Sequence, residues 1–345
     1  MTEAGPPSAP DEAPEAEPTH GILGRLLRAL ALLAVLLAIV AWAPGLDEVR
    51  RHLSGAAPGW LAVAVALEAL SALSFVLLFS RFFGRVLPRR RVWELSWSEL
   101  GMGSLVPASG VAGLALGAWV LHRHGRPAGW IARRSVAFFL IKSSVNFVAV
   151  AAIGVAMAVG LVGPPQPLWL TLVPAVLAAA TIAAVLLLGR LQEPPIPEDA
   201  PRTRIWWVGV RRALVGGMRE AIAIGRTRDV GIILGATGYW IFDNAVLWAT
   251  YEAVGVVPPV SSILMGYLIG QMGGALPIPG GVGGIDLGLT GMMAAYGAPV
   301  AATAAAVLAY RVILFWLPLI VGGPAFWSLL RAMRAEESAA TARAH

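Results

Sequence analysis

Hydrophobic residues in this chain run in long blocks, and short polar segments rich in arginine separate the blocks. A helix needs about 20 consecutive apolar residues to cross about 30 Å of bilayer hydrocarbon. Six blocks are of this length, so the pattern predicts six complete membrane-spanning helices. They cover residues 26–43, 58–80, 135–161, 168–189, 230–252 and 299–322.

Two further apolar regions, 94–121 and 258–297, are interrupted in the middle by proline and glycine. Proline stops a helix, and glycine permits a tight chain reversal. Such backbone persists at membrane depth only where protein covers it or a water-filled cavity adjoins it. We therefore expect two re-entrant hairpins. Their turns would contain Pro107, Ser109, Gly110 and Gly113 in the first region, and Pro277, Pro279, Gly280, Gly281, Gly283 and Gly284 in the second.

The arginines between the blocks fall almost entirely on one set of loops, and the other set holds only Arg50 and Arg51. Cytoplasmic loops carry the excess of basic residues in membrane proteins. Both termini and every arginine-rich loop are therefore predicted to be cytoplasmic. With six crossings, region 94–121 would then enter from the cytoplasmic face and region 258–297 from the opposite face.

The two broken regions also resemble each other in sequence. "GSLVPASGVAGLALG" (103–117) aligns with "GALPIPGGVGGIDLG" (274–288), and "HGRP" (124–127) aligns with "YGAP" (296–299). Similar sequence in opposite topology is typical of inverted repeats in transporters, whose broken helices hold the substrate near the midplane. The predicted fold is an all-α polytopic membrane protein built from two inverted repeats.

The order of these segments predicts five parts of the chain. The first is rich in proline, alanine and glutamate, a composition typical of disorder. The arginines of the linker between the repeats recur at helical spacing, which favours a helix lying on anionic headgroups, although topological anchoring alone also explains them. The parts are a cytoplasmic tail (1–21), a first membrane repeat (22–189), a cytoplasmic linker with an interfacial amphipathic helix (190–229), a second membrane repeat (230–330) and a cytoplasmic tail (331–345).

Composition narrows the function classes. The chain is 57% apolar and only 13% charged, whereas soluble domains carry about 25% charged residues. It has no cysteine, and its five histidines lie outside the apolar blocks, so we expect neither a metal site nor a cofactor. Dinucleotide and phosphate-loop motifs are absent. Nucleic-acid binding is not expected, because the basic residues are spread over several juxtamembrane loops.

Five charged side chains fall inside the apolar blocks: Glu68, Lys142, Asp243, Asp286 and Arg311. Each costs about 2.5–3.5 kcal/mol at the centre of an inserted helix, so a functional or paired role is the default interpretation. We expect Asp286, Arg311, Lys142 and Glu68 to line a polar cavity. A structural ion pair between Asp286 and Arg311, and snorkelling of Lys142, are the alternatives. Asp243 is interpreted as a hydrogen-bonding partner of a neighbouring helix.

The stretch "PIPGGVGGIDLGL…YGAP…AYRVILFWLPLIVGG" resembles the signature of the flippase-like membrane domain of bacterial lysylphosphatidylglycerol synthases and their stand-alone relatives. That family has a Pro-Gly-Gly-x-Gly-x-x-acid turn, then a glycine, then a helix with arginine, tryptophan and proline. The acid is usually glutamate there, and the first copy usually has more glycine. The matching positions are Pro279, Gly280, Gly281, Gly283, Asp286, Gly297, Arg311, Trp316, Pro318 and Gly322.

The resemblance implies movement of a phospholipid or a lipid-linked polyprenyl molecule between leaflets of the bacterial cell membrane by alternating access. It does not imply lysyl transfer, which belongs to a separate soluble domain in the fused synthases. No catalytic motif is found, so we do not expect an enzyme. The alternatives are a membrane enzyme acting on lipids and a non-transporting scaffold of envelope lipid synthesis. Membrane lipids are the expected partners. An envelope-synthesis protein and a second copy of the chain are further candidate partners.

Overall fold

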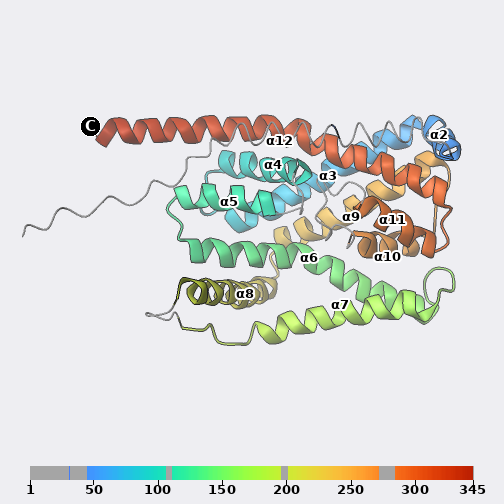
Figure 1. Ribbon diagram of the computed structural model, residues 1–345, viewed down its shortest axis with the longest axis horizontal. Coiled ribbons are helices and arrows are strands. Elements are labelled where there is room, and N and C mark those ends of the chain that lie inside the picture. Colours follow the sequence, from blue (N-terminus) through green and yellow to red (C-terminus); the bar gives the residue numbers. More distant parts are fainter. Residues whose placement is uncertain (1–30, 32–44, 106–110, 196–200, 272–283, 345) are drawn as a thin grey trace, which may run out of the picture.

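The described part of the chain consists of helices and the short connections between them. The computed structural model describes residue 31 and residues 45–105, 111–195, 201–271 and 284–344. Within those ranges there are eleven helices, α2 to α12, and no strand (Figure 1). Five of them are long and apolar enough to cross a membrane. An all-α, multi-pass membrane protein is therefore confirmed.

The five candidate spans overlap five of the six predicted blocks, and the sixth block (26–43) lies outside the described residues apart from residue 31. The last span belongs to a helix that continues through the predicted C-terminal tail, where alanine, glutamate and arginine favour helix. Its spanning part is Val300–Glu336. The helices are α3 (Pro58–Phe83), α6 (Ala128–Ala158), α7 (Leu168–Leu188), α9 (Val230–Val254) and α12 (Val300–Ala344).

Each interrupted apolar region contains two described helices. The first pair is α4 (Arg89–Leu105) and α5 (Val111–Arg123), and the second is α10 (Val260–Gln271) and α11 (Gly284–Ala295). Most of the predicted turn lies outside the described residues, and only Gly113 and Gly284 fall inside helices. The two pairs lie toward opposite ends of the long spans (Figure 1). Re-entrance into the membrane stays a prediction.

The two pairs end in the same local structure. Gly125 after α5 has φ +77° and Gly297 after α11 has φ +89°. In both places the glycine N–H donates to a carbonyl three residues back, and the next N–H donates to one five residues back. This is the Schellman helix end, which needs a left-handed residue. A proline two positions later, Pro127 or Pro299, precedes the next long helix. The "HGRP" and "YGAP" segments thus adopt the same turn.

Small residues allow close packing between the two halves of the chain. Helix α9 lies along α3, and a Cβ on Gly235 would stand 2.8 Å from the backbone nitrogen of Leu78. Helix α12 crosses α4 where Gly101 faces Gly322. Close backbone approach through glycine is the usual device for packing helices in lipid, where apolar side chains have no preference for protein over acyl chains.

The remaining helices are α2 (Asp47–Ser54) and α8 (Arg202–Thr227). Helix α8 is the helix predicted in the arginine-rich linker, and it packs on α6 at the same end of the molecule as the C-terminus (Figure 1). Glu193 lies within 3.4–3.8 Å of guanidinium nitrogens of Arg133, Arg212 and Arg219. Part of the arginine charge of the linker is therefore used to hold α8 in place.

The crossing of α12 on α4 leads to a first prediction. A Cβ at position 322 would lie 2.4 Å from the carbonyl oxygen of Trp97 and 3.0 Å from Cα of Gly101. Backbone atoms cannot yield to such contacts, so we expect Gly322→Ala to destabilise the protein by about 1–3 kcal/mol. Thermal unfolding in detergent would measure this. Gly323→Ala is the matched control, since no heavy atom lies within 4 Å of that Cβ. Equal midpoints for the two variants would contradict the prediction.

Candidate functional site

The acid and the arginine predicted from the sequence form an ion pair. Asp286 lies in the first turn of α11, and its Oδ1 is 2.7 Å from Nε of Arg311 on α12. An acidic residue at this position is also favoured by the positive end of the helix dipole. The side chains of Asp286 and Arg311 are 18% and 20% exposed. The pair is thus partly sheltered and still reachable from outside.

Asp243 of α9 joins three helices. Its carboxylate is buried and accepts hydrogen bonds from the hydroxyls of Tyr267 on α10 and Tyr310 on α12, the second at 3.0 Å. These are interhelical hydrogen bonds of the kind that the sequence interpretation favoured. Asp243 also interacts electrostatically with Arg311, the residue that follows Tyr310.

Glu68 of α3 faces this carboxylate from the other half of the chain. Its side chain is buried, and it interacts electrostatically with Asp243. Its Oε2 has no hydrogen-bond partner among the described residues. A buried carboxyl oxygen without a partner is unfavourable, and two carboxyl groups at close range disfavour double ionisation. A proton or a cation beside them would therefore stabilise the arrangement.

Lys142 of α6 supplies a second positive charge. Its Nζ lies 5.7–5.8 Å from the ring centroids of Phe75, Phe139 and Tyr239, within the range of cation–π attraction. It also interacts electrostatically with Asp243 and with Glu99 of α4. The ammonium group therefore lies among aromatic rings. All four residues predicted to line a cavity belong to one connected group whose centre is Asp243. We call this group the polar cluster: Glu68, Lys142, Asp243, Tyr267, Asp286, Tyr310 and Arg311.

Sequence reasoning missed Glu99, Tyr267 and Tyr310. Glu99 comes so close to α5 that a Cβ on Gly117 would lie 2.5 Å from its Oε1. A signal for the tyrosines was present, since all five tyrosines of the chain lie in its second half, within or at the ends of apolar regions. A hydroxyl inside a membrane needs a hydrogen-bonding partner, and Asp243 was an available acceptor.

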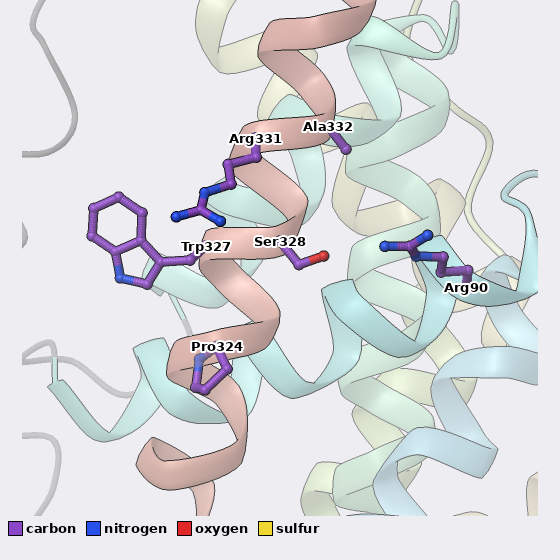
Figure 2. Close-up of a pocket in the computed structure, with 6 residues that line it drawn as sticks. All are labelled: Arg90, Pro324, Trp327, Ser328, Arg331 and Ala332. Carbon is purple, nitrogen blue, oxygen red and sulfur yellow. The ribbon is translucent and has the colours of Figure 1, made fainter.

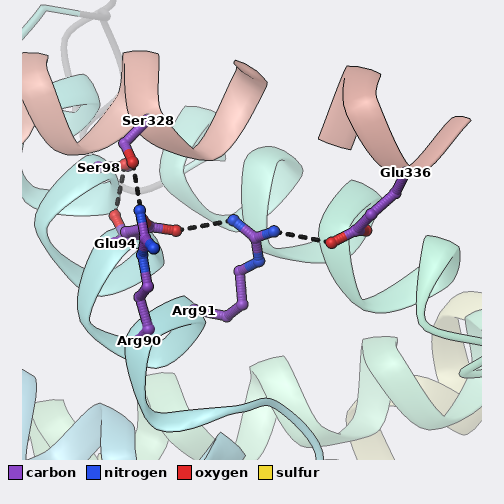
Figure 3. A network of polar contacts seen from close by, with 6 residues as sticks. All are labelled: Arg90, Arg91, Glu94, Ser98, Ser328 and Glu336. Carbon is purple, nitrogen blue, oxygen red and sulfur yellow. Dashed lines mark hydrogen bonds and ion pairs between the residues drawn. The ribbon is translucent and has the colours of Figure 1, made fainter. Parts of the chain in front are cut away.

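A second polar network ties the start of α4 to α12 (Figure 3). Glu94 accepts hydrogen bonds from Arg90 and Arg91, both at 2.9 Å, and from Ser328 at 2.8 Å. Arg91 also donates to Glu336 at 2.7 Å. Burial acts to raise the pKa of the Glu94 carboxyl, but these hydrogen bonds outweigh burial and hold that pKa below its ordinary value. Glu94 therefore stays ionised at neutral pH and keeps the two helices together.

The described ranges contain no group of three or more histidines and acids that could hold a metal ion. An open groove of about 570 Å³ lies away from the polar cluster, between α4 and α12 (Figure 2). The polar cluster itself draws its side chains from α3, α6, α9, α10, α11 and α12, and Oε2 of Glu68 is left without a hydrogen-bond partner among the described residues.

Apolar spans that enclose paired charges define a multi-pass membrane protein with a polar interior. The sequence model of the family described as "Lysylphosphatidylglycerol synthase TM region" matches residues 26–322, and the chain belongs to this family. The resemblance inferred from the glycine-rich turn and the helix after it is thereby confirmed. The match includes both interrupted regions and every residue of the polar cluster. A search of curated proteins found no match to this chain.

Proposed function

We propose that this protein moves a phospholipid or a polyprenyl-linked lipid between the leaflets of the cell membrane by alternating access, with its termini and arginine-rich end in the cytoplasm. Membership in a family named for lysylphosphatidylglycerol synthases supports a role with lipids. The observation that carries the proposal is the polar cluster, because ionisable residues gathered inside apolar spans mark substrate or ion pathways.

The Asp286–Arg311 pair suits recognition of a headgroup. A guanidinium binds phosphate through two parallel N–H···O bonds, and it binds carboxylate in the same way. A lipid phosphate would therefore compete with Asp286 for Arg311. In this mechanism the ion pair of 2.7 Å closes the empty site, and the headgroup replaces Asp286 when the site opens. Asp286 then recaptures Arg311 after release.

Asp243 would connect this exchange to movement of the second helix pair. It interacts with Arg311 and bonds to Tyr267 of α10 and Tyr310 of α12. Displacement of Arg311 would change the charge that faces Asp243. The hydrogen bond between Asp243 and Tyr267 of α10 would then weaken. The chain has no nucleotide-binding motif, so an ion gradient, coupled synthesis or simple equilibration would supply any driving force. Proton coupling through Asp286 is part of the proposal, and a catalytic role is not.

Liposomes that contain the purified protein and labelled phosphatidylglycerol or polyprenyl phosphate would test the proposal. We expect Arg311→Ala to slow leaflet exchange at least about tenfold, because a charge-assisted contact to the headgroup is lost. Arg311→Lys should retain part of the rate. Asp47→Ala is the matched control, because Asp47 pairs with Arg50 at 2.5 Å on the exposed surface.

Exchange by folded Arg311→Ala at the rate of the unchanged protein would overturn the proposal. If neither lipid is exchanged by the unchanged protein while an envelope-synthesis enzyme is still bound, the scaffold alternative is supported instead. Exchange that is insensitive to a proton gradient and unaltered by Asp286→Asn would remove proton coupling alone.

A further inference from the structure

A groove opens between the start of α4 and the last third of the spanning part of α12. Its volume is about 570 Å³. In Figure 2, Arg90 of α4 points toward Ser328, while Trp327 and Arg331 project from α12 on the same side as each other. The lining residues are Arg90, Pro324, Trp327, Ser328, Arg331 and Ala332.

The length of α12 puts this groove at headgroup depth. A helix rises about 1.5 Å per residue, so the 37 residues of Val300–Glu336 extend about 55 Å. A bilayer has about 30 Å of hydrocarbon and about 40–45 Å with its headgroups. If Val300 lies at one interface, Trp327 is about 40 Å along the helix and lies within the opposite headgroup layer. Trp327 is 53% exposed, as tryptophans at membrane interfaces are.

The groove carries positive charge that the described side chains do not fully neutralise. Arg331 is exposed and makes no ion pair with any residue that the structure describes. The side chain of Arg90 is 79% exposed, and its Nε donates the hydrogen bond to Glu94, so neither Nη group is used in that bond. Glu94 is shared with Arg91 and Ser328. Among the described side chains, three arginines thus face two acids here, Glu94 and Glu336, and the excess positive charge lies along the groove.

We propose that this groove binds the phosphate headgroup of an anionic phospholipid. The phosphate would lie between Arg90 and Arg331, and an acyl chain would run along Pro324 and Trp327 toward the membrane interior. Basic pockets between spanning helices at this depth are suited to anionic lipid headgroups. The site is separate from the Asp286–Arg311 pair and does not rest on the proposed function. A bound lipid would link α4, the first helix of the first pair, to α12.

Native mass spectrometry of the full-length protein would test this site, with palmitoyl-oleoyl phosphatidylglycerol or phosphatidylcholine added in detergent. We expect Arg90→Ala combined with Arg331→Ala to weaken phosphatidylglycerol binding about 25-fold. This corresponds to about fivefold per arginine, the factor for about 1 kcal/mol of electrostatic attraction each. Phosphatidylcholine binding should not change.

Arg334→Ala is the control, because Arg334 is exposed on the same helix and does not line the groove. Equal weakening by Arg334→Ala would mean diffuse surface attraction and would overturn the proposal. So would complete displacement of the lipid by millimolar inorganic phosphate, which would identify a site for free anions.

A second measurement does not depend on the double variant folding. A photoreactive residue at Ala332, with both arginines retained, should crosslink phosphatidylglycerol in preference to phosphatidylcholine in mixed nanodiscs. Equal crosslinking of the two lipids would overturn the proposal even if the double variant were unstable. Because neither readout involves leaflet exchange, failure of this site and failure of the transport proposal are distinguishable.

Discussion

Asp243→Ala is expected to lower stability more than any other single substitution among the buried polar residues of this protein. The change leaves the hydroxyls of Tyr267 and Tyr310 without their acceptor. It also removes the negative charge that faces Arg311 and Lys142. Removal of one member of a buried charged group costs about 3–5 kcal/mol, because the remaining charges lose their compensation. Thermal or denaturant-induced unfolding in detergent would measure the loss.

Conservative variants separate the two causes. Asp243→Asn keeps one acceptor oxygen and removes only the charge, so its loss should be smaller than that of Asp243→Ala. Tyr310→Phe removes a donor at 3.0 Å and leaves the charge, for which about 1 kcal/mol is expected. If Asp243→Ala is no more destabilising than Tyr310→Phe, Asp243 is not the centre of the polar cluster.

A double-mutant cycle on Asp286 and Arg311 is expected to show strong coupling. Each single alanine substitution leaves a sheltered charge without its partner at 2.7 Å, whereas the double substitution removes both charges. The double variant should therefore lose less stability than the sum of the single variants, by about 1–3 kcal/mol. Arg311→Ala should be more harmful than Asp286→Ala, since Arg311 also faces Asp243.

The exposed pair Asp47–Arg50 is the control for this cycle. Its side chains are 76% and 32% exposed, and such surface pairs are typically worth about 0–1 kcal/mol. If the stability losses of Asp286→Ala and Arg311→Ala simply add, and the coupling is no larger than that of the surface pair, then water screens the inner pair. The headgroup-exchange mechanism would then lose its physical basis. In that mechanism the Asp286–Arg311 attraction holds the empty site closed, and a pair that water screens would not hold it.

Stability requires a positive charge at Arg311, whereas the proposed transport also requires its planar guanidinium. Unfolding in detergent and lipid exchange in liposomes can therefore be compared for the same variant. Arg311→Lys preserves the charge opposite Asp286 but removes the planar fork that can hold two phosphate oxygens. The unfolding midpoint of Arg311→Lys should therefore be close to that of the unchanged protein, whereas its rate of lipid exchange should be clearly lower. Equal retention of both properties would indicate that Arg311 acts only as a point charge.

The positions of the spanning helices could be predicted from the sequence because the requirement is local. A block of apolar residues either is or is not long enough to cross the hydrocarbon, whatever surrounds it. The interruptions of the two apolar regions were likewise marked in the sequence by proline and glycine. Partnership between Asp286 and Arg311 was also predictable in outline, because an isolated charge inside an apolar block is costly.

Tertiary structure decided three features that the sequence did not predict. They are the partners of Asp243, the contact of Lys142 with aromatic rings and the groove beside Arg90. Tyr267 and Tyr310 lie 24 and 67 residues from Asp243, on other helices. In water, an amphipathic stripe tells which face of a helix turns inward. Helices α3 and α9 are apolar both on the sides that pack against other helices and on the sides that face away from the protein, so their sequences carry no such stripe. Their rotation, and with it the meeting of Glu68 and Asp243, is set by glycine contacts such as Gly235 against Leu78, which exist only once both helices are in place.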